Sequence, residues 1–178
     1  MKLKVFRYKN VQSTNNTARR IIKKTNLSQG MIISEIQKKG RGQYGRKWIS
    51  YKGNLFVSFF YTCSDLSNSL SKLTKFNCLL VKKLLEKYYK KLIIFKKPND
   101  LLIKKKKICG ILQETMKKNG KNYLIVGIGI NLIKSPSIKD YPTISLKDLI
   151  SKNLIKRKIE NDLKKIFEIN MKKLVSYK

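Results

Sequence analysis

The chain has 178 residues, 42% of them hydrophobic, and a formal net charge of +32. This length and hydrophobic content predict one globular domain with a substantial core and exclude a disordered chain. The chain contains no histidine, which excludes Ser-His-Asp triads, Cys-His pairs and histidine-containing zinc sites.

The positive charge comes mostly from lysine, which is spread along the whole chain, whereas arginine is scarce. A charge this large suggests a nucleic-acid or membrane-surface partner. Base readout and phosphate clamping, however, rely on the planar fork of arginine. We therefore interpret the lysines mainly as a solvated surface and expect no specific DNA binding, and we keep a lysine-rich nucleic-acid-binding module as an alternative.

The cysteines and the distribution of apolar residues indicate a cytoplasmic protein. Cys63, Cys78 and Cys109 are odd in number and widely spaced, so they fit neither a disulfide framework nor a zinc knuckle and are expected to be buried thiols. The N-terminal residues lack the long apolar segment of a secretory signal. No apolar run approaches the ~20 residues that span a bilayer, so no membrane association is expected.

The first part of the chain predicts two strands and one helix. Alternating apolar residues predict a strand at residues 3–8, and a buried strand follows at residues 31–36. Between them, Ser13 is a typical N-cap for a helix at residues 16–24.

A basic loop at residues 40–50 follows the second strand. Three glycines fall within six positions, interleaved with Arg41 and Arg46, and the single tryptophan, Trp48, comes next. Glycine allows close backbone approach to a ligand, and free N–H groups beside guanidinium groups suit phosphate oxygens. The loop is neither a Walker loop nor a dinucleotide fingerprint, and alone it would also fit an ordinary basic surface loop. We interpret Trp48 as a packing anchor at the end of the loop.

The rest of the chain predicts mostly strands. An aromatic and β-branched run predicts a strand at residues 53–62, then a polar turn at 65–71 and an amphipathic helix at 73–89. Further strands are predicted at residues 92–95, 101–103, 108–114 and 123–132. Further helices are predicted at residues 145–150 and 156–174.

Two short motifs lie between and within these strands. Pro98-Asn99-Asp100 predicts a turn, and the lysines at residues 104–106 are interpreted as a solvated turn. Gly127 and Gly129 alternate along one strand. They keep one face of that strand flat, either for a ligand or for packing within the sheet.

Several blocks occur in a characteristic order along the chain. They are Ser13-Thr14-Asn15, Glu35-Ile36-Gln37, the basic loop, Lys96-Lys97-Pro98-Asn99-Asp100, Lys107-Ile108-Cys109-Gly110-Ile111-Leu112-Gln113-Glu114 and Val126-Gly127-Ile128-Gly129-Ile130-Asn131. In this order and at these separations they resemble the catalytic domain of biotin–protein ligases, within the biotin/lipoate ligase superfamily. The resemblance runs from about Val5 to Leu132, roughly three-quarters of the chain.

The resemblance implies a role for individual residues. Biotin is expected to contact Ser13, Thr14, Asn15, Gln37, Arg41, Gly42, Gln43, Lys107 and Gly110. The nucleotide is expected to contact Arg46, Asp100 and Asn131, and Asp100 is also a candidate Mg²⁺ ligand. Lys107 and Arg41 are the expected catalytic residues, because their charges would offset the repulsion between the biotin carboxylate and the α-phosphate.

Two positions depart from the family pattern. Gln43 replaces the second arginine of the usual Gly-Arg-Gly-Arg motif. A neutral amide cannot supply the charge that arginine gives to a phosphate, so we expect weaker retention of the reactive intermediate. Lys97 replaces the tryptophan of the usual Lys-Trp-Pro-Asn-Asp motif, which changes the local wall of the expected site.

The resemblance also implies an activity and an architecture. It implies an ATP-dependent biotin–[acetyl-CoA-carboxylase] ligase that uses Mg²⁺, forms biotinyl-5′-AMP and biotinylates one lysine of a biotin carboxyl carrier domain. The implied fold is α/β (α+β), with a mixed, mostly antiparallel sheet and helices packed on one side.

The expected organisation is a single catalytic domain over residues 1–178, with a core at about 1–135 and a helical segment at about 145–178. Neither an N-terminal winged helix nor a C-terminal SH3-like barrel is expected, and the protein is expected to be a monomer or homodimer. A lipoate or octanoate ligase or transferase, and a decayed ligase of weak activity, remain as alternatives.

Overall fold

A computed structural model describes residues 2–63, 70–139, 141–151 and 153–175, with side chains up to residue 170. The strands are β1 (Lys4–Val11), β2 (Gln29–Gln37), β3 (Leu55–Cys63), β4 (Ile94–Lys96), β5 (Asp100–Ile103), β6 (Lys106–Lys118) and β7 (Lys121–Ile130). The helices are α1 (Thr14–Lys24), α2 (Leu70–Leu85) and α3 (Lys156–Val175). The predicted polar turn at residues 65–71 falls mostly outside the described residues.

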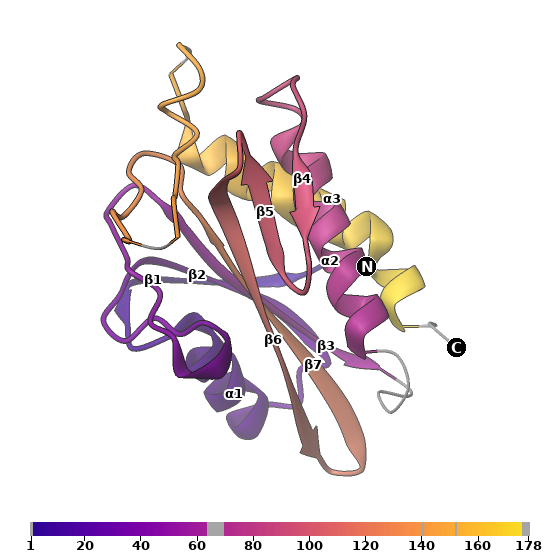
Figure 1. Cartoon of the computed structure of the whole chain (residues 1–178). Coiled ribbons are helices and arrows are strands. Elements are labelled where there is room, and N and C mark those ends of the chain that lie inside the picture. The colour runs from indigo at the N-terminus through magenta and orange to yellow at the C-terminus, as the bar shows by residue number, and fades with distance from the viewer. Residues whose placement is uncertain (1, 64–69, 140, 152, 176–178) are drawn as a thin grey trace.

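Across the described residues, seven strands form one mixed sheet in the order β1-β2-β3-β7-β6-β5-β4 (Figure 1). β1 and β2 are parallel and are connected through α1, as a parallel pair requires. Every other neighbouring pair is antiparallel. The prediction of a mixed, mostly antiparallel α+β sheet is therefore confirmed.

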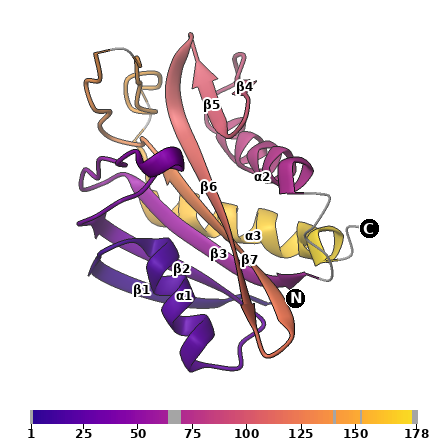
Figure 2. The same ribbon diagram turned by 60° about the horizontal axis from the view of Figure 1, so that its bottom comes forward.

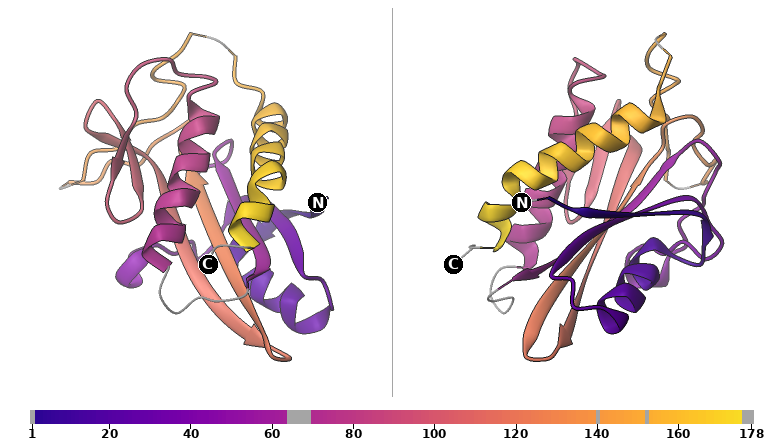
Figure 3. Two further views of the ribbon diagram at one scale, coloured as in Figure 1. Left: turned by 90° about the vertical axis from the view of Figure 1, so that its right-hand side faces the viewer. Right: turned by 180° about the vertical axis from the view of Figure 1, so that it is seen from behind.

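Helices cover both faces of the sheet, which corrects the prediction that they pack on one side (Figures 2 and 3). On one face, Phe59 of β3 stacks on Phe167 of α3 with ring centroids 3.9 Å apart. On the other face, Phe60 packs with Ile22 of α1. Successive strand residues point to opposite faces, and the largely apolar β3 is buried along almost its whole length, so it is covered on both sides.

Helix α1 covers only part of its face of the sheet. Tyr123 and Ile125 of β7 pack against α1, but the next residues on the same face are Gly127 and Gly129. On the neighbouring strand β6, Gly110 is the register partner of Gly129. The sheet beyond the N-terminus of α1 therefore carries a floor of glycines, and we call Gly110, Gly127 and Gly129 the glycine floor.

The helix predicted at residues 145–150 is wrong, because this segment forms a single turn. The Ser145 amide and hydroxyl both donate to Asp148 Oδ2, at 2.9 and 2.7 Å. The amides of Leu146 and Lys147 donate to the carbonyls of Asn131 and Leu132. These amides are used to attach the segment to the end of β7, so they are not available for a helix. The helix predicted at residues 156–174 is α3.

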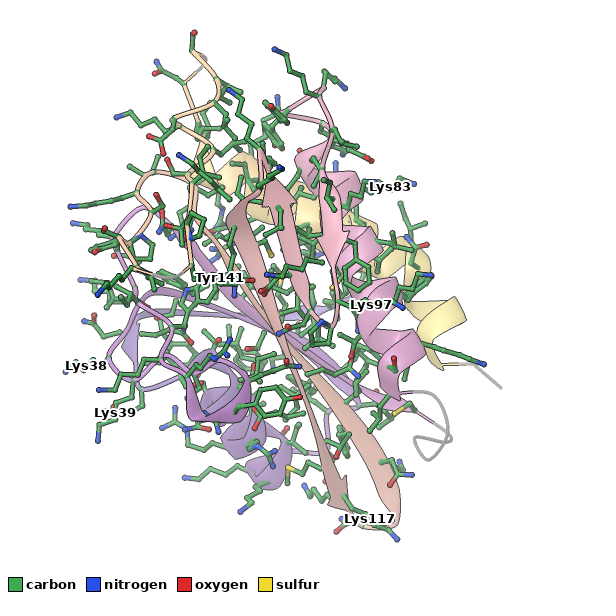
Figure 4. The ribbon with its side chains drawn as sticks, in the orientation of Figure 1. Lys38, Lys39, Lys83, Lys97, Lys117 and Tyr141 are labelled. Carbon is green, nitrogen blue, oxygen red and sulfur yellow. The ribbon has the colours of Figure 1, made fainter. Side chains whose placement is uncertain are left out.

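The cysteines and several surface lysines agree with the sequence interpretation. The three cysteines are buried, and burial raises the pKa of Cys78 to about 12. Lys38, Lys39 and Lys117 extend outward at the edge of the molecule (Figure 4), as expected for a solvated surface. Within the described part of the chain, no helix combines the length and the apolar character needed to cross a membrane.

Candidate functional site

A cavity of about 870 Å³ lies over the glycine floor, within the usual size range of small-molecule sites. Its other walls are the N-terminus of α1, the basic loop and the turn before β5, together with Pro136, Ile138, Tyr141 and Thr143. All twelve residues predicted to bind biotin or nucleotide line it: Ser13, Thr14, Asn15, Gln37, Arg41, Gly42, Gln43, Arg46, Asp100, Lys107, Gly110 and Asn131. Segments that are far apart in the sequence are thus brought together, while the role of each residue stays a prediction.

Side chains of the site press directly against the glycine floor. A Cβ atom at Gly127 would lie 2.4 Å from Asn15 Oδ1, and one at Gly129 would lie 2.4 Å from Trp48 Cε2. At Gly110 a Cβ would lie 2.8 Å from Trp48 Cζ3. Glycine is therefore required at these positions by close approach, rather than by backbone conformation.

Trp48 is more than the packing anchor predicted from the sequence. Its indole lies over Gly110 and Gly129 and forms part of the cavity lining. Its Nε1 is buried and has no hydrogen-bond partner among the described groups. The ring therefore also faces the site.

The N-terminus of α1 is held by Gln37 rather than by the side chain of Ser13. Ser13 occupies the N-cap position, but its side chain makes no capping bond. Instead, the Thr14 amide and hydroxyl both donate to Gln37 Oε1, at 2.8 and 3.0 Å. The predicted capping bond of Ser13 is therefore wrong, and Gln37 at the end of β2 accepts from the first free amide of the helix, that of Thr14.

Asn15 is a fixed polar group between the helix and the sheet. Its Nδ2 donates to the Leu112 carbonyl at 3.1 Å and to Glu114 Oε2 at 2.7 Å. Its Oδ1 accepts a hydrogen bond of 2.5 Å from the Ser58 hydroxyl. Because Asn15 is only 2% exposed, these bonds fix its position beside Gly127.

Lys107 carries an ammonium group that is held from several sides. Its Nζ lies 2.8 Å from Asp100 Oδ1, and the side chain is only 20% exposed. The same Nζ lies 5.4 Å from the ring centre of Trp48 and 5.2 Å from that of Tyr141, within cation–π range. The Lys107 amide donates to the Pro142 carbonyl at 2.8 Å. Lys107 is therefore a fixed cation at the cavity wall.

Tyr141 is a residue of the site that sequence reasoning missed. Its hydroxyl donates a hydrogen bond to Asp100 Oδ2, and Lys96 lies over its ring at 4.6 Å. Burial, together with the hydrogen bond to Asp100, raises the pKa of Tyr141, so the phenol stays protonated and remains a donor. Tyr141 belongs to a stretch without clear periodicity, and no sequence signal places it near Asp100.

Arg41 lines the cavity, but its guanidinium group is paired. Arg41 Nη2 lies 2.9 and 3.0 Å from the two carboxylate oxygens of Glu114 and 2.9 Å from Asn16 Oδ1. Arg19 also approaches Glu114, at 3.4 Å. Glu114 was part of a family block but had no predicted role. It lies far from Arg41 in the sequence, and only the fold brings the two side chains together.

The remaining predicted nucleotide contacts differ in their burial. Arg46 is exposed at the end of a 3-10 turn (Gln43–Gly45). Asn131 is 2% exposed, and its Oδ1 has no hydrogen-bond partner among the described groups. An orphaned buried acceptor that lines a cavity is a natural point of contact for a ligand that donates a hydrogen bond.

Asp100 does not fit a metal site in this arrangement. One carboxylate oxygen is paired with the Lys107 ammonium, and the other accepts from Tyr141. No cluster of three or more acidic, histidine or cysteine ligands occurs among the residues that the structure covers. An ammonium at 2.8 Å would repel a divalent cation at the same carboxylate.

Comparison with known proteins agrees with this geometry. Residues 8–131 match the Biotin/lipoate A/B protein ligase family. The bifunctional ligase/repressor BirA of Bacillus subtilis is 30% identical over 141 residues, which are 78% of this chain and 42% of that protein. BirA of Escherichia coli K12 is 33% identical over 102 residues, 56% of this chain and 32% of that protein. The chain thus spans about a third to two-fifths of these curated relatives.

Solved structures show the same architecture. The biotin protein ligase from Aquifex aeolicus in complex with biotin and ATP superposes with a TM-score of 0.79 at 31% identity, covering 97% of this chain and 72% of that one. The enzyme from Leishmania major in complex with biotinyl-5-AMP gives a TM-score of 0.79 at 25% identity, with 95% and 75% covered. A lipoate-protein ligase A bound with ATP shares the fold, with a TM-score of 0.70 at 12% identity. Because the family match extends over more than half of the sequence, the chain belongs to the Biotin/lipoate A/B protein ligase family.

Proposed function

We propose that the chain activates biotin with ATP, forming biotinyl-5′-AMP, and transfers the biotinyl group to one lysine of a biotin carboxyl carrier domain. The observation that carries this proposal is the fixed ammonium of Lys107, placed in a cavity that is lined by all the predicted biotin and nucleotide residues. Relatives with the same architecture have been solved with biotin and ATP, and with biotinyl-5-AMP.

The first step joins two anions, which explains why a buried cation is needed. The biotin carboxylate oxygen attacks the α-phosphorus, and the bond from that phosphorus to the pyrophosphate leaving group breaks. Two unit charges at 4 Å repel by about 4 kcal/mol at an effective dielectric constant of about 20. Lys107 would offset this repulsion without moving, because its backbone and its ammonium are already fixed.

Asp100 and Tyr141 would act on the reaction through Lys107. Asp100 directs the ammonium into the cavity, and Tyr141 holds the second oxygen of the same carboxylate. An ammonium has three donor hydrogens, so Lys107 can stay in its ion pair with Asp100 and still donate to a ligand. These residues orient charge and need no histidine base, in agreement with the composition of the chain.

The polar residues at the N-terminus of α1 would recognise biotin, and the opposite end of the cavity would bind the nucleotide. Thr14, Asn15 and Gln37 offer donors and acceptors that are already held by neighbouring groups, which limits the entropic cost of binding. Asn131 would accept a hydrogen bond from the adenylate through its unpartnered Oδ1. Arg46 would lie near the phosphates at the cavity mouth.

Mg²⁺ would enter with the triphosphate rather than on a site built by Asp100. The carboxylate of Asp100 is engaged by Lys107 and Tyr141, so no step is assigned to a metal held there.

In the second step, the carrier lysine attacks the carbonyl carbon of the mixed anhydride, and AMP leaves. The site would mainly position the two reactants and exclude water from the anhydride. The carrier domain, a cytoplasmic location and a monomeric or homodimeric state remain parts of this proposal.

Biotin-dependent exchange of pyrophosphate into ATP tests the proposal directly, with octanoate and lipoate as alternative acids. Exchange with biotin alone supports it, whereas exchange only with octanoate or lipoate would assign the chain to the lipoate branch of the family. A salt-sensitive complex with RNA and no exchange with any acid would favour the nucleic-acid-binding alternative.

A further inference from the structure

Glu114 connects three separate parts of the site. It belongs to β6, it accepts from Asn15 of α1, and it pairs with Arg41 of the basic loop through both carboxylate oxygens. Its side chain is 17% exposed, whereas that of Arg41 is 42% exposed. In a chain with only ten acidic residues and 42 basic ones, a partly buried carboxylate is a rare negative charge. Here it attracts the guanidinium groups of Arg41 and Arg19.

The basic loop has its own internal structure. The Gly42 amide donates to the Arg46 carbonyl at 2.7 Å, and the Trp48 amide donates to the Gly40 carbonyl at 3.0 Å. These two bonds define an antiparallel bridge between Arg41 and Lys47. A segment paired with itself in this way can move as one unit on its connections to the sheet, so its position depends on contacts with other elements.

The side chains of Trp48 and Arg41 hold this unit against the rest of the site. Trp48 lies on Gly110 and Gly129 at one side of the loop. Arg41 reaches Glu114 and Asn16 at the other. The Arg41 guanidinium is therefore used to attach the loop, and much of its charge is balanced by Glu114 before any ligand arrives.

We propose that Glu114 is a positioning residue that, through Arg41, holds the basic loop closed over the bound biotinyl adenylate. This inference rests on the function proposed above and extends it to a residue with no previous role in the site. Loss of the pair frees the loop to open, so the adenylate is released faster while its formation, which depends on Lys107, is much less affected.

Trp48 offers a direct readout of loop position, because it is the only tryptophan of the chain. In Glu114→Gln, the amide retains an acceptor for Asn15 but loses the charge that binds Arg41. We expect acrylamide to quench Trp48 fluorescence about twofold more efficiently than in the wild-type chain, since exposed loop segments open at low free-energy cost. Release of biotinyl-5′-AMP, formed in place from biotin and ATP, should accelerate about fivefold, the size expected for a partly exposed ion pair.

Matched controls distinguish loss of the contact between Glu114 and Arg41 from a general change of charge. Glu86→Gln removes a carboxylate that is 50% exposed and paired with Lys82 on α2, and it should leave quenching and release unchanged. Arg19→Gln removes the other arginine beside Glu114 without touching the loop, and it should also leave Trp48 quenching unchanged.

A double-mutant cycle distinguishes action through Arg41 from action through Asn15. Arg41→Gln should reproduce the increased quenching, and adding Glu114→Gln to it should change quenching little further. Independent, additive effects of the two substitutions, or wild-type quenching in Glu114→Gln, would overturn the proposal. A wild-type chain without biotin-dependent exchange would refute the proposed function instead. The quenching measurements would still decide whether Glu114 holds the loop closed through Arg41.

Discussion

The two cationic walls of the cavity differ in how they are built. Lys107 lies on β6, with its backbone bonded to neighbouring segments and its ammonium held by the buried carboxylate of Asp100. Arg41 lies on a self-paired loop, and its guanidinium is held by Glu114, which does not line the cavity. Residues with the same charge and the same predicted role thus have different physical surroundings. We call the side with Lys107 the strand wall and the side with Arg41 the loop wall. The strand wall is suited to supplying fixed charge, and the loop wall is suited to closing over a ligand.

The largest expected effect comes from the strand wall. Lys107→Ala should slow biotin-dependent pyrophosphate exchange by about 10²–10³-fold, because a preorganised charge facing the reacting phosphate is lost. Lys106→Ala is the matched control, since Lys106 precedes Lys107 on the same strand but is exposed. Normal exchange by Lys107→Ala would show that the fixed ammonium is not the essential charge of the site.

Two alanine substitutions on β7 compare the mobility of the basic loop with that of the buried Asn15 on α1. In Gly127→Ala, the new methyl group would meet Asn15, which is fixed by Ser58 and Glu114. We expect a loss of about 1–3 kcal/mol in unfolding free energy, typical of overpacking a rigid contact, together with weaker biotin binding.

Gly129→Ala introduces a methyl group that would meet Trp48 on the basic loop instead. A loop can move away more easily than a buried polar network, so the loss of unfolding free energy should stay below about 1 kcal/mol, while acrylamide quenching of Trp48 increases. Urea denaturation of both variants, followed by circular dichroism, measures the difference. Equal destabilisation of the two would mean that the loop is as rigid as the hydrogen-bonded Asn15 of α1.

Tyr141→Phe sharpens the description of the strand wall. The substitution keeps the ring near Lys107 and removes the donor to Asp100, so we expect kcat for exchange to fall about three- to tenfold with little change in the KM for biotin. The raised pKa of Tyr141 means that the phenol stays protonated below its ordinary value of 10.0. The ratio of wild-type to variant rates should therefore be constant from about pH 6 to pH 9, and a ratio that changed within this window would contradict a purely donating phenol.

The same pKa predicts a stability effect at alkaline pH. Above pH 10 the unfolded chain loses the Tyr141 proton while the folded chain keeps it, so the unfolded state binds fewer protons and the unfolding free energy falls as pH rises. Tyr141→Phe should make this fall less steep, which urea denaturation at a series of pH values would detect.

The sequence predicts the strands well because their apolar and β-branched runs carry a local signal. It predicts the contents of the cavity through the order of the family blocks, and all twelve predicted residues do line one cavity. It misses what depends on distant register. Several features join residues that no local pattern connects. They are the helices on both faces, the Gln37 cap on α1, the role of Tyr141 beside Asp100, and the Arg41–Glu114 pair. The incorrect helix at residues 145–150 has the same origin, since its amides bond to the carbonyls after β7.

The smallest expected effect concerns Gln43, the neutral residue at the position where the family usually has a second arginine. Gln43 begins the turn of the basic loop and lines the cavity. Gln43→Arg adds a guanidinium group to the loop wall, so release of biotinyl-5′-AMP should slow about threefold at low salt, and the difference should shrink at 1 M salt because the added charge is partly exposed. Gln29→Arg adds the same charge at the opposite end of β2 and should leave release unchanged.

The exchange rate of Gln43→Arg at saturating biotin and ATP should remain within about twofold of the wild-type rate. Charge added to the loop would then act on retention, while charge on the strand acts on the chemical step. A large increase in exchange rate, comparable in size to the loss caused by Lys107→Ala, would show that both walls act on the same transition state and that the division between them is not real.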